Sequence, residues 1–343
     1  MITKTYSFIK NGNVNEVYTL KNKNGMEVDI LTYGGRITRI SAPDKHGNFS
    51  DCVVGCKRPE DYYEDNPYFG ATIGRFGNRI GGSAFTLNGQ EYRLDANEGE
   101  NTLHGGTEGD FSRKIWSANI VKDRLELSYL SPDGESGFPG ALSVTVAFSL
   151  NEQNELKIEY KATSDKDTVC NLTNHTYFNI GYQDTVLDHV LMINARQITP
   201  VDKELIPHGE LMNIDNTPYS FLYPKKLGQD MFSDAPLIKQ CNGYDFNYCL
   251  DRVGKSLEKI AYVYDEESGR RMDCYTTLPA VQLYTACATG GFKGKKEYVN
   301  HCALCLETQG YPNSPNCPEY PSTVLKAGEQ YHEVTVYRFS VKK

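Results

Sequence analysis

Short segments of alternating apolar and polar residues recur along the whole chain. Residues 142–148 are the clearest case, because Leu, Val, Val and Phe alternate there with Ser, Thr and Ala. Successive side chains of a strand point to opposite faces, so this pattern predicts strands with one buried face. The same alternation predicts strands at 26–30, 125–129, 156–160, 260–264, 272–274, 281–284 and 333–341. In 260–264 the apolar set consists of Ile260, Tyr262 and Tyr264.

These strands are expected to form one large all-β domain. Turn-forming clusters such as Gly34-Gly35 separate the alternating segments, and no helical period is sustained over the roughly 10–12 residues that a helix prediction needs. We find no break in composition and no linker that would divide residues 1–343. On the order of twenty strands would fit a chain of this length. The predicted architecture is a β-sandwich of two facing sheets.

Composition and charge argue against several kinds of partner. The net charge is −8 and no Lys/Arg-rich run is present, so nucleic acid and anionic membranes are not expected partners. No stretch approaches the roughly 20 apolar residues of a membrane span. The first residues lack the apolar block of a signal peptide, and we therefore expect a cytoplasmic protein.

The ten cysteines are expected to be reduced. A chain of this length without a secretion signal more often uses cysteines as small apolar side chains than as disulfides. Cys302 and Cys305 form a lone C-x-x-C, with no second such motif at zinc-finger spacing. They belong to the apolar run 302–306, which a buried strand explains.

The polar segment 171–179 is the first candidate site. It lies between strand-like segments near the middle of the chain and carries many hydrogen-bond donors and acceptors. Buried polar groups need partners, so the segment is either a ligand-facing surface or a core strand with satisfied polar groups. On the first interpretation His175 is the natural proton carrier, because its unperturbed pKa lies near neutrality. On the second it is a structural histidine.

Glycine-rich segments supply two further candidates. In 70–82 the side chains of Arg75 and Arg79 offer donors suited to sugar hydroxyls or a carboxylate. The order of a phosphate-binding loop is absent there, and the alternative is two surface arginines in a loop. In 101–106 the glycines that follow His104 would let its ring face a cleft. A structural histidine is the alternative.

Two carboxylates stand in apolar surroundings. Asp245 lies between aromatic residues and needs donors, which sugar hydroxyls would supply, unless it caps its own turn. Glu307 follows the apolar run 302–306, so we expect it near the end of a buried strand. Burial there would raise its pKa and suit it to act as a base; the alternative is a glutamate that faces solvent. No serine elbow, phosphate loop or pair of histidines at ligand spacing accompanies these residues.

At these residues the chain resembles the galactose mutarotases, or aldose 1-epimerases. The resemblance covers nearly the whole length and rests on segments in the same order at 74–80, 103–106, 171–179, 243–245, 281–285 and 306–309. It implies a galactose mutarotase-like supersandwich that binds a free monosaccharide such as galactose or glucose. It implies no cofactor and no metal, and we expect a monomer or a weak dimer.

The resemblance also assigns roles to particular residues. Glu307 looks like the base and His175 like the acid. Six residues look like sugar contacts: Asn78, Arg79, His104, Tyr177, Asp245 and Gln282. Phe246 and Asn313 stand where histidine and aspartate are common in the family, which bears on substrate preference.

The activity implied is the interconversion of α- and β-anomers by ring opening and reclosure. An ionised Glu307 would take a proton from the anomeric hydroxyl and a protonated His175 would give one to the ring oxygen. Each such group typically contributes about 10²–10⁴-fold. Three alternatives stay open: a non-catalytic carbohydrate-binding protein on the same fold, a hydrolase or lyase acting on glycosides, and a zinc enzyme using His104, His175 and Glu307.

Overall fold

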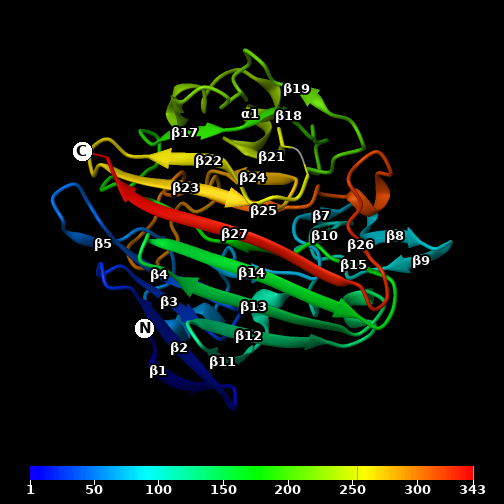
Figure 1. Ribbon diagram of the computed structural model, residues 1–343. Coiled ribbons are helices and arrows are strands. Elements are labelled where there is room, and N and C mark those ends of the chain that lie inside the picture. Colours follow the sequence, from blue (N-terminus) through cyan, green and yellow to red (C-terminus); the bar gives the residue numbers. More distant parts are fainter. Residues whose placement is uncertain (253, 343) are drawn as a thin grey trace.

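The computed structural model describes residues 1–252 and 254–342, and its regular structure is almost entirely β (Figure 1). The largest sheet has nine antiparallel strands in the order β11-β12-β13-β14-β27-β23-β22-β17-β20. Their bounds are β11 Ser117–Val121, β12 Arg124–Ser131, β13 Leu142–Leu150, β14 Glu155–Ser164, β17 Val190–Ile193, β20 Lys225–Lys226, β22 Glu258–Tyr264, β23 Arg270–Thr276 and β27 Gln330–Val341. The all-β prediction is confirmed.

Two sheets of five strands accompany it. The N-terminal sheet is a meander of β1 Ile2–Lys10, β2 Asn13–Lys21, β3 Glu27–Leu31, β4 Arg36–Pro43 and β5 Phe49–Asp51. The other five-stranded sheet, which carries most of the site, has the order β19-β18-β21-β24-β25. Its bounds are β18 Ala195–Ile198, β19 Met212–Asn213, β21 Asp245–Leu250, β24 Ala280–Tyr284 and β25 Cys305–Gln309.

Short elements complete the chain. Four strand pairs are β6 Ala71–Ile73 with β16 Thr173–His175, β7 Arg79–Ile80 with β10 Thr102–Leu103, β8 Ala84–Leu87 with β9 Gln90–Arg93, and β15 Thr168–Val169 with β26 Val324–Leu325. Among the described residues the α-helix is the six-residue α1 Pro236–Cys241, and the 3-10 turns are η1 Pro59–Tyr63, η2 Gly81–Ser83, η3 Phe111–Arg113, η4 Glu135–Gly137, η5 Leu227–Gln229 and η6 Ser314–Asn316. No helix in the described ranges is both long and apolar enough to cross a bilayer.

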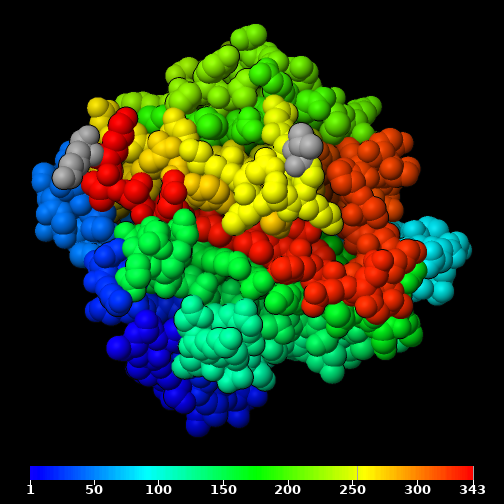
Figure 2. Space-filling model, viewed as in Figure 1, coloured from blue at the N-terminus to red at the C-terminus, as the bar shows by residue number. Residues whose placement is uncertain are grey.

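A shared apolar core explains why the sheets pack face to face. The alternating residues of β13 predicted to face inward, from Leu142 to Phe148, are fully buried. They belong to one cluster with Val28 of β3 and Leu283 of β24, so the three large sheets bury a common set of side chains. The space-filling view shows the outer surface of the nine-stranded sheet, where β27 forms a band between β14 and β23 (Figure 2). The predicted sandwich is therefore confirmed.

The predicted inward face of β22 is wrong after its first residues. A bulge shifts the β22–β23 register between Lys259 and Ala261, and Ala261 and Val263 are the buried residues beyond it. Because a bulge inserts one residue into a strand, it exchanges the inward and outward faces from that point on. Tyr262 is therefore half-exposed, and the guanidinium of Arg271 lies 3.8 Å from the centre of its ring.

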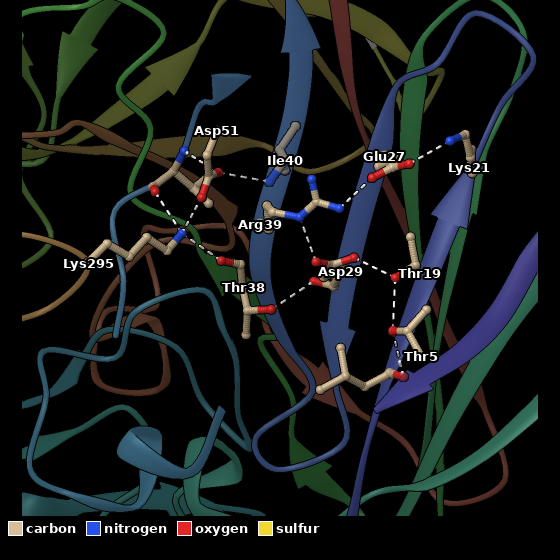
Figure 3. Close-up of polar contacts among 12 residues, drawn as sticks. Thr5, Thr19, Lys21, Glu27, Asp29, Thr38, Arg39, Ile40, Asp51 and Lys295 are labelled. Atoms are coloured by element: carbon tan, nitrogen blue, oxygen red, sulfur yellow. Dashed lines mark hydrogen bonds and ion pairs between the residues drawn. The ribbon is translucent and has the colours of Figure 1, made fainter. Parts of the chain in front are cut away.

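Polar residues on the outer side of the N-terminal sheet pair across neighbouring strands (Figure 3). Arg39 of β4 donates to Asp29 at 2.7 Å and to Glu27 at 2.5 Å, both on β3. Thr19 of β2 donates to Asp29 at 2.7 Å, and Lys21 donates to Glu27 at 2.7 Å. Opposite charges that face each other across strands are the pairs that stabilise a sheet surface. The alternation in 26–30 thus correctly separates the polar face from the buried one.

Candidate active site

A single pocket of about 370 Å³ brings together the predicted site residues. It is lined by all eight of them: Asn78, Arg79, His104, His175, Tyr177, Asp245, Gln282 and Glu307. Sequence reasoning missed the other lining residues, which are Pro67, Tyr68, Glu98, Leu103, Leu205, Gln240, Cys241, Tyr284, Cys287 and Ala288. Most of these lie in loops or in α1, where no periodic pattern marks a residue as facing a pocket.

The floor of the pocket is one face of β21, β24 and β25. Gln282 lies opposite Asn247 on one side and opposite Glu307 on the other. Leu283 and Leu306 belong to the apolar core, so the alternating neighbours Gln282 and Glu307 face the other way, into the pocket. This strand geometry places a carboxyl group among polar neighbours at the centre of the face.

Glu307 is the third of the five residues of β25, so the prediction that it stands near a strand end is wrong. The strand begins at Cys305 because the preceding residues pair elsewhere: Leu304 forms an isolated bridge with Phe178, and His301 binds the carbonyl of Ala286 through its amide. The alternative of a solvent-facing glutamate is excluded, since Glu307 is buried.

In the segment 171–179, a polar side chain faces the pocket and others are hydrogen-bonded inside the protein, so each of the two interpretations holds for some of its residues. His175 lines the pocket, at the end of β16, which pairs with β6. The asparagines nearby are satisfied inside the protein. The Asn171 amide donates to the carbonyl of Gly77 at 3.1 Å and accepts from the amide of Gly310 at 2.7 Å, and Asn174 donates to Gly70 at 3.0 Å.

The His175 imidazole and the Glu307 carboxyl face each other across this pocket. Nε2 of His175 lies 3.6 Å from Oε1 of Glu307, and neither His175 Nδ1 nor Glu307 Oε2 has a partner among the described residues. The imidazole is nearly parallel to two tyrosine rings, with centroid distances of 4.9 Å to Tyr177 and 6.0 Å to Tyr68. Aromatic faces stabilise a cation, so these rings favour a protonated imidazole.

Burial opposes charge on both members of the pair. It lowers the pKa of His175 to about 3 and raises the pKa of Glu307 well above its usual range, with Asp245 adding to the rise and Arg79 opposing it. The uncharged pair and the ion pair contain the same number of protons, because one transfer from Glu307 to His175 interconverts them. A sugar that donates hydroxyl hydrogens to the carboxylate would favour the ion pair.

His104 is held as a neutral hydrogen-bond donor. Its Nδ1 accepts from the backbone amide of Asn78 at 3.1 Å, so the ring proton is on Nε2. Burial lowers the pKa of His104 well below its usual range, and the nearby His175 and Arg79 add to this effect. Gly105 makes the arrangement possible: its φ is +93°, and a Cβ there would lie 2.2 Å from the carbonyl oxygen of Gly74.

Arg79, Asp245 and Gln282 form a second polar group in the pocket. Gln282 Nε2 donates to Asp245 Oδ1 at 2.6 Å. Burial raises the pKa of Asp245, while Arg79 and this hydrogen bond counteract the rise. Arg79 itself is bound by Glu98 through two hydrogen bonds. Tyr177 lines the same pocket, but its hydroxyl donates to the carbonyl of Pro67 at 2.7 Å.

Arg75 lies outside the site, although the sequence pattern predicts the same role for Arg75 and Arg79. It is 1% exposed, and its guanidinium donates to the carbonyls of Pro132, Pro139 and Gly140 and to Ser131. Its role is structural, and the alternative of two surface arginines is wrong for both residues.

The two departures from the family pattern also lie outside the pocket lining. Phe246 follows Asp245 on β21 and therefore faces the core, where it packs edge-on against Tyr219 at 5.6 Å. The side-chain oxygen of Asn313 accepts from the backbone amide of Gly81 at 3.0 Å, and the backbone amide of Asn313 donates to the carbonyl of Arg79. Neither side chain lines the pocket, so no direct contact with a bound ligand supports the expected effect on substrate preference.

A metal site fits these residues poorly. Ligand atoms of His104, His175 and Glu307 lie within 4.8 Å of one another, which is the zinc alternative raised by the sequence. However, Nδ1 of His104 already accepts from Asn78, and the other ring nitrogen carries the proton. Only two unblocked ligands then remain, fewer than the three protein ligands of a catalytic zinc. All ten cysteines are free, and nine of them are buried.

Comparison with known proteins agrees with this geometry. The sequence profile described as aldose 1-epimerase matches residues 16–338. Galactose mutarotase of Sus scrofa is 40% identical over 321 residues, covering 92% of each chain, and aldose 1-epimerase of Escherichia coli K12 is 35% identical over 345 aligned positions, covering 99% of each. The crystal structure of a GalM/aldose epimerase homologue from C. elegans has a TM-score of 0.89 at 27% identity and covers 96% of this chain and 100% of its own. The chain belongs to the aldose 1-epimerase family.

Proposed function

We propose that this protein interconverts the α- and β-anomers of free aldohexoses, with galactose and glucose as the first substrates to test. The observation that carries the proposal is the buried pair of His175 and Glu307, 3.6 Å apart and unpartnered on their other polar atoms. Membership of the aldose 1-epimerase family and the names of its relatives support the same activity. Neither a sugar-binding protein without activity nor a glycoside hydrolase is favoured by these names.

Ring opening needs two proton transfers, ring closure needs the two reverse transfers, and no step is a redox step. The carboxylate of Glu307 removes the proton of the anomeric hydroxyl while the imidazolium of His175 protonates the ring oxygen. The electron pair of that O–H bond forms the aldehyde C=O, and the C1–O5 bond breaks with its electrons going to O5. Rotation about C1–C2 then presents the other face, and the reverse transfers close the ring. The starting protonation states return, as a catalyst requires.

The remaining pocket residues hold the sugar during this rotation. Asp245, Arg79 and Gln282 supply a carboxylate, a guanidinium and an amide that suit adjacent sugar hydroxyls, and Nε2 of His104 supplies a fixed donor. Such contacts keep the open-chain aldehyde in place, and positioning of this kind accounts for a large part of enzymatic rate enhancements. Tyr177 acts through its ring, which packs on His175, and Asn78 orients His104 through its backbone amide.

Polarimetry on freshly dissolved α-D-galactose tests the proposal. The protein should accelerate the change in optical rotation in proportion to its concentration, and a panel of aldoses would then rank the substrates. A rate equal to the spontaneous one would refute the activity and favour a binding protein. Release of reducing sugar from a synthetic glycoside would identify a hydrolase.

Three broader expectations remain proposals. The core cluster contains residues from Tyr18 to Phe339, which supports a single domain over residues 1–343. Cytoplasmic location and a monomeric or weakly dimeric state are proposed on sequence grounds, and size-exclusion chromatography with light scattering would test the latter.

A further inference from the structure

A carboxylate that belongs to none of the motifs shared with the family binds the pocket arginine. Nε of Arg79 donates to Oε2 of Glu98 at 2.5 Å, and Nη2 donates to Oε1 at 2.8 Å. The Arg79 side chain is 11% exposed, whereas that of Glu98 is 39% exposed. Glu98 therefore stands at the rim of the pocket and reaches inward to an almost buried cation.

The loop that carries Glu98 is well defined by hydrogen bonds. The amides of Glu98 and Asn101 each bind the other's carbonyl, at 3.1 and 3.0 Å. The Asn97 side chain donates to the carbonyl of Leu103 and accepts from its amide. The next residue is His104, so one short segment supplies both the carboxylate that binds Arg79 and the imidazole donor of the pocket.

We propose that Glu98 is a positioning residue for the epimerase reaction, which fixes the Arg79 guanidinium and offsets its positive charge next to Asp245 and Glu307. The inference rests on the proposed function. It assigns to Glu98 no contact with the reacting atoms; its effect is transmitted through Arg79.

The first effect is geometric. An arginine has five N–H donors in a rigid fork, and a two-point pairing with a carboxylate fixes the orientation of that fork. Glu98 uses two of the donors and leaves three for the sugar and for Asp245. Because the side chain is already ordered, sugar binding does not have to immobilise it, and immobilising one long side chain typically costs about 0.5–1.5 kcal/mol.

The second effect is electrostatic. Arg79 lowers the pKa of both Asp245 and Glu307, whereas Glu98 raises the pKa of Asp245. Without the Glu98 charge the guanidinium would act unopposed, and both carboxyl groups would ionise at lower pH. A base with a lower pKa accepts a proton less readily. The other titratable groups around these carboxyls are His104, His175, Tyr68, Tyr177, Tyr284, Tyr337, Cys241, Cys287 and Cys305.

The test compares three variants with the wild type. Glu98→Gln removes the charge and one acceptor oxygen, whereas Glu98→Asp keeps the charge on a shorter side chain. Glu100→Gln is the matched control, because it makes the same change of charge two residues away on an exposed side chain. The measurements are kcat and KM for galactose and the pH profile of kcat/KM for each protein.

We expect Glu98→Gln to raise KM by roughly two- to tenfold, which corresponds to the ordering cost of one side chain. Its acid limb in the pH profile should move to lower pH. Glu98→Asp should raise KM but leave the acid limb in place, because only the geometry is lost. Glu100→Gln should match the wild type in both readouts.

The outcomes separate this inference from the function itself. If the wild type does not accelerate anomer interconversion, the proposed function fails. If the wild type is active and Glu98→Gln matches Glu100→Gln in both KM and acid limb, the role of Glu98 is overturned. Thermal melting of each variant shows whether it is folded. If Glu98→Gln does not fold, Glu98→Asp is the deciding variant. A KM of Glu98→Asp equal to that of the wild type would then refute the proposed positioning of Arg79 by Glu98.

Discussion

Replacing Glu307 with glutamine separates the proposed catalytic role of this side chain from its effect on stability. Glutamine has nearly the same shape but cannot accept the anomeric proton. A positioned general base typically contributes about 10²–10⁴-fold to a rate, which corresponds to about 2.7–5.4 kcal/mol of activation free energy. We expect kcat to fall by a factor in that range, while sugar binding changes little because the amide still offers an acceptor.

The same substitution should change the pH dependence of stability. Burial raises the pKa of Glu307 well above its ordinary value of 4.5, so the native state holds a proton that the unfolded state releases above that pH. The stability that this proton provides is complete below pH 4.5 and is lost as the pH rises, by at most about 1.4 kcal/mol per unit. Glutamine carries no such dependence. Glu307→Gln should therefore become more stable than the wild type as the pH rises from 5 to 8.

Two measurements check the pair of expectations. Polarimetry with fresh α-D-galactose gives the rate, and urea unfolding at several pH values gives the free energy of unfolding. Turnover above about a tenth of the wild-type value would refute the assignment of Glu307 as the base. A stability difference that stays constant with pH would refute the claim that its carboxyl is buried in protonated form.

Four further outcomes are expected. His175→Gln should abolish most activity. Because burial lowers the pKa of His175 to about 3, the wild type is destabilised increasingly as the pH falls below 6.5, and the variant is not. The free energy of unfolding of the variant should therefore exceed that of the wild type by about 2 kcal/mol at pH 5, and equal unfolding curves at that pH would contradict this. Leu205 lines the pocket with φ at +63°, so Leu205→Gly should be more stable than Leu205→Ala by about 1 kcal/mol, whereas both should raise KM. Arg75→Met would leave buried carbonyls unpaired and should lower the unfolding free energy by about 3–6 kcal/mol, as urea melts would show, with normal activity per folded molecule. Treatment with a chelator should leave the rate in polarimetry unchanged, and a loss reversed by zinc would restore the metal alternative.

Local periodicity was sufficient to predict where the strands lie, but it was insufficient to predict which face of some strands is buried. The alternation in 142–148 correctly identifies the inward residues of β13, because each residue's direction follows from that of its neighbour. In β22 the bulge between Lys259 and Ala261 breaks that relation. A bulge depends on how the strand pairs with its partner, and the sequence of β22 alone does not contain that information.

The site shows the same division. Arg75 and Arg79 stand four residues apart in one glycine-rich segment, and nothing local separates them. Arg75 binds carbonyls from 132–140 in the core, whereas Arg79 meets Glu98 at the pocket. Glu98 was missed because its role depends on this contact and not on any motif. Their residue types and the likeness to the epimerases point to His175 and Glu307 as acid and base, but their separation of 3.6 Å is a property of the folded chain.

The amino-acid sequence by itself determined the strand-rich architecture, the family and the chemical types of group available for catalysis, since these follow from local pattern and shared motifs. Tertiary structure decided which polar groups are buried together and therefore which are charged. The physical reason is that pKa values and hydrogen-bond partners depend on distance and burial in space, and residues brought together by strand pairing, such as Gln282 and Glu307, can be far apart along the chain.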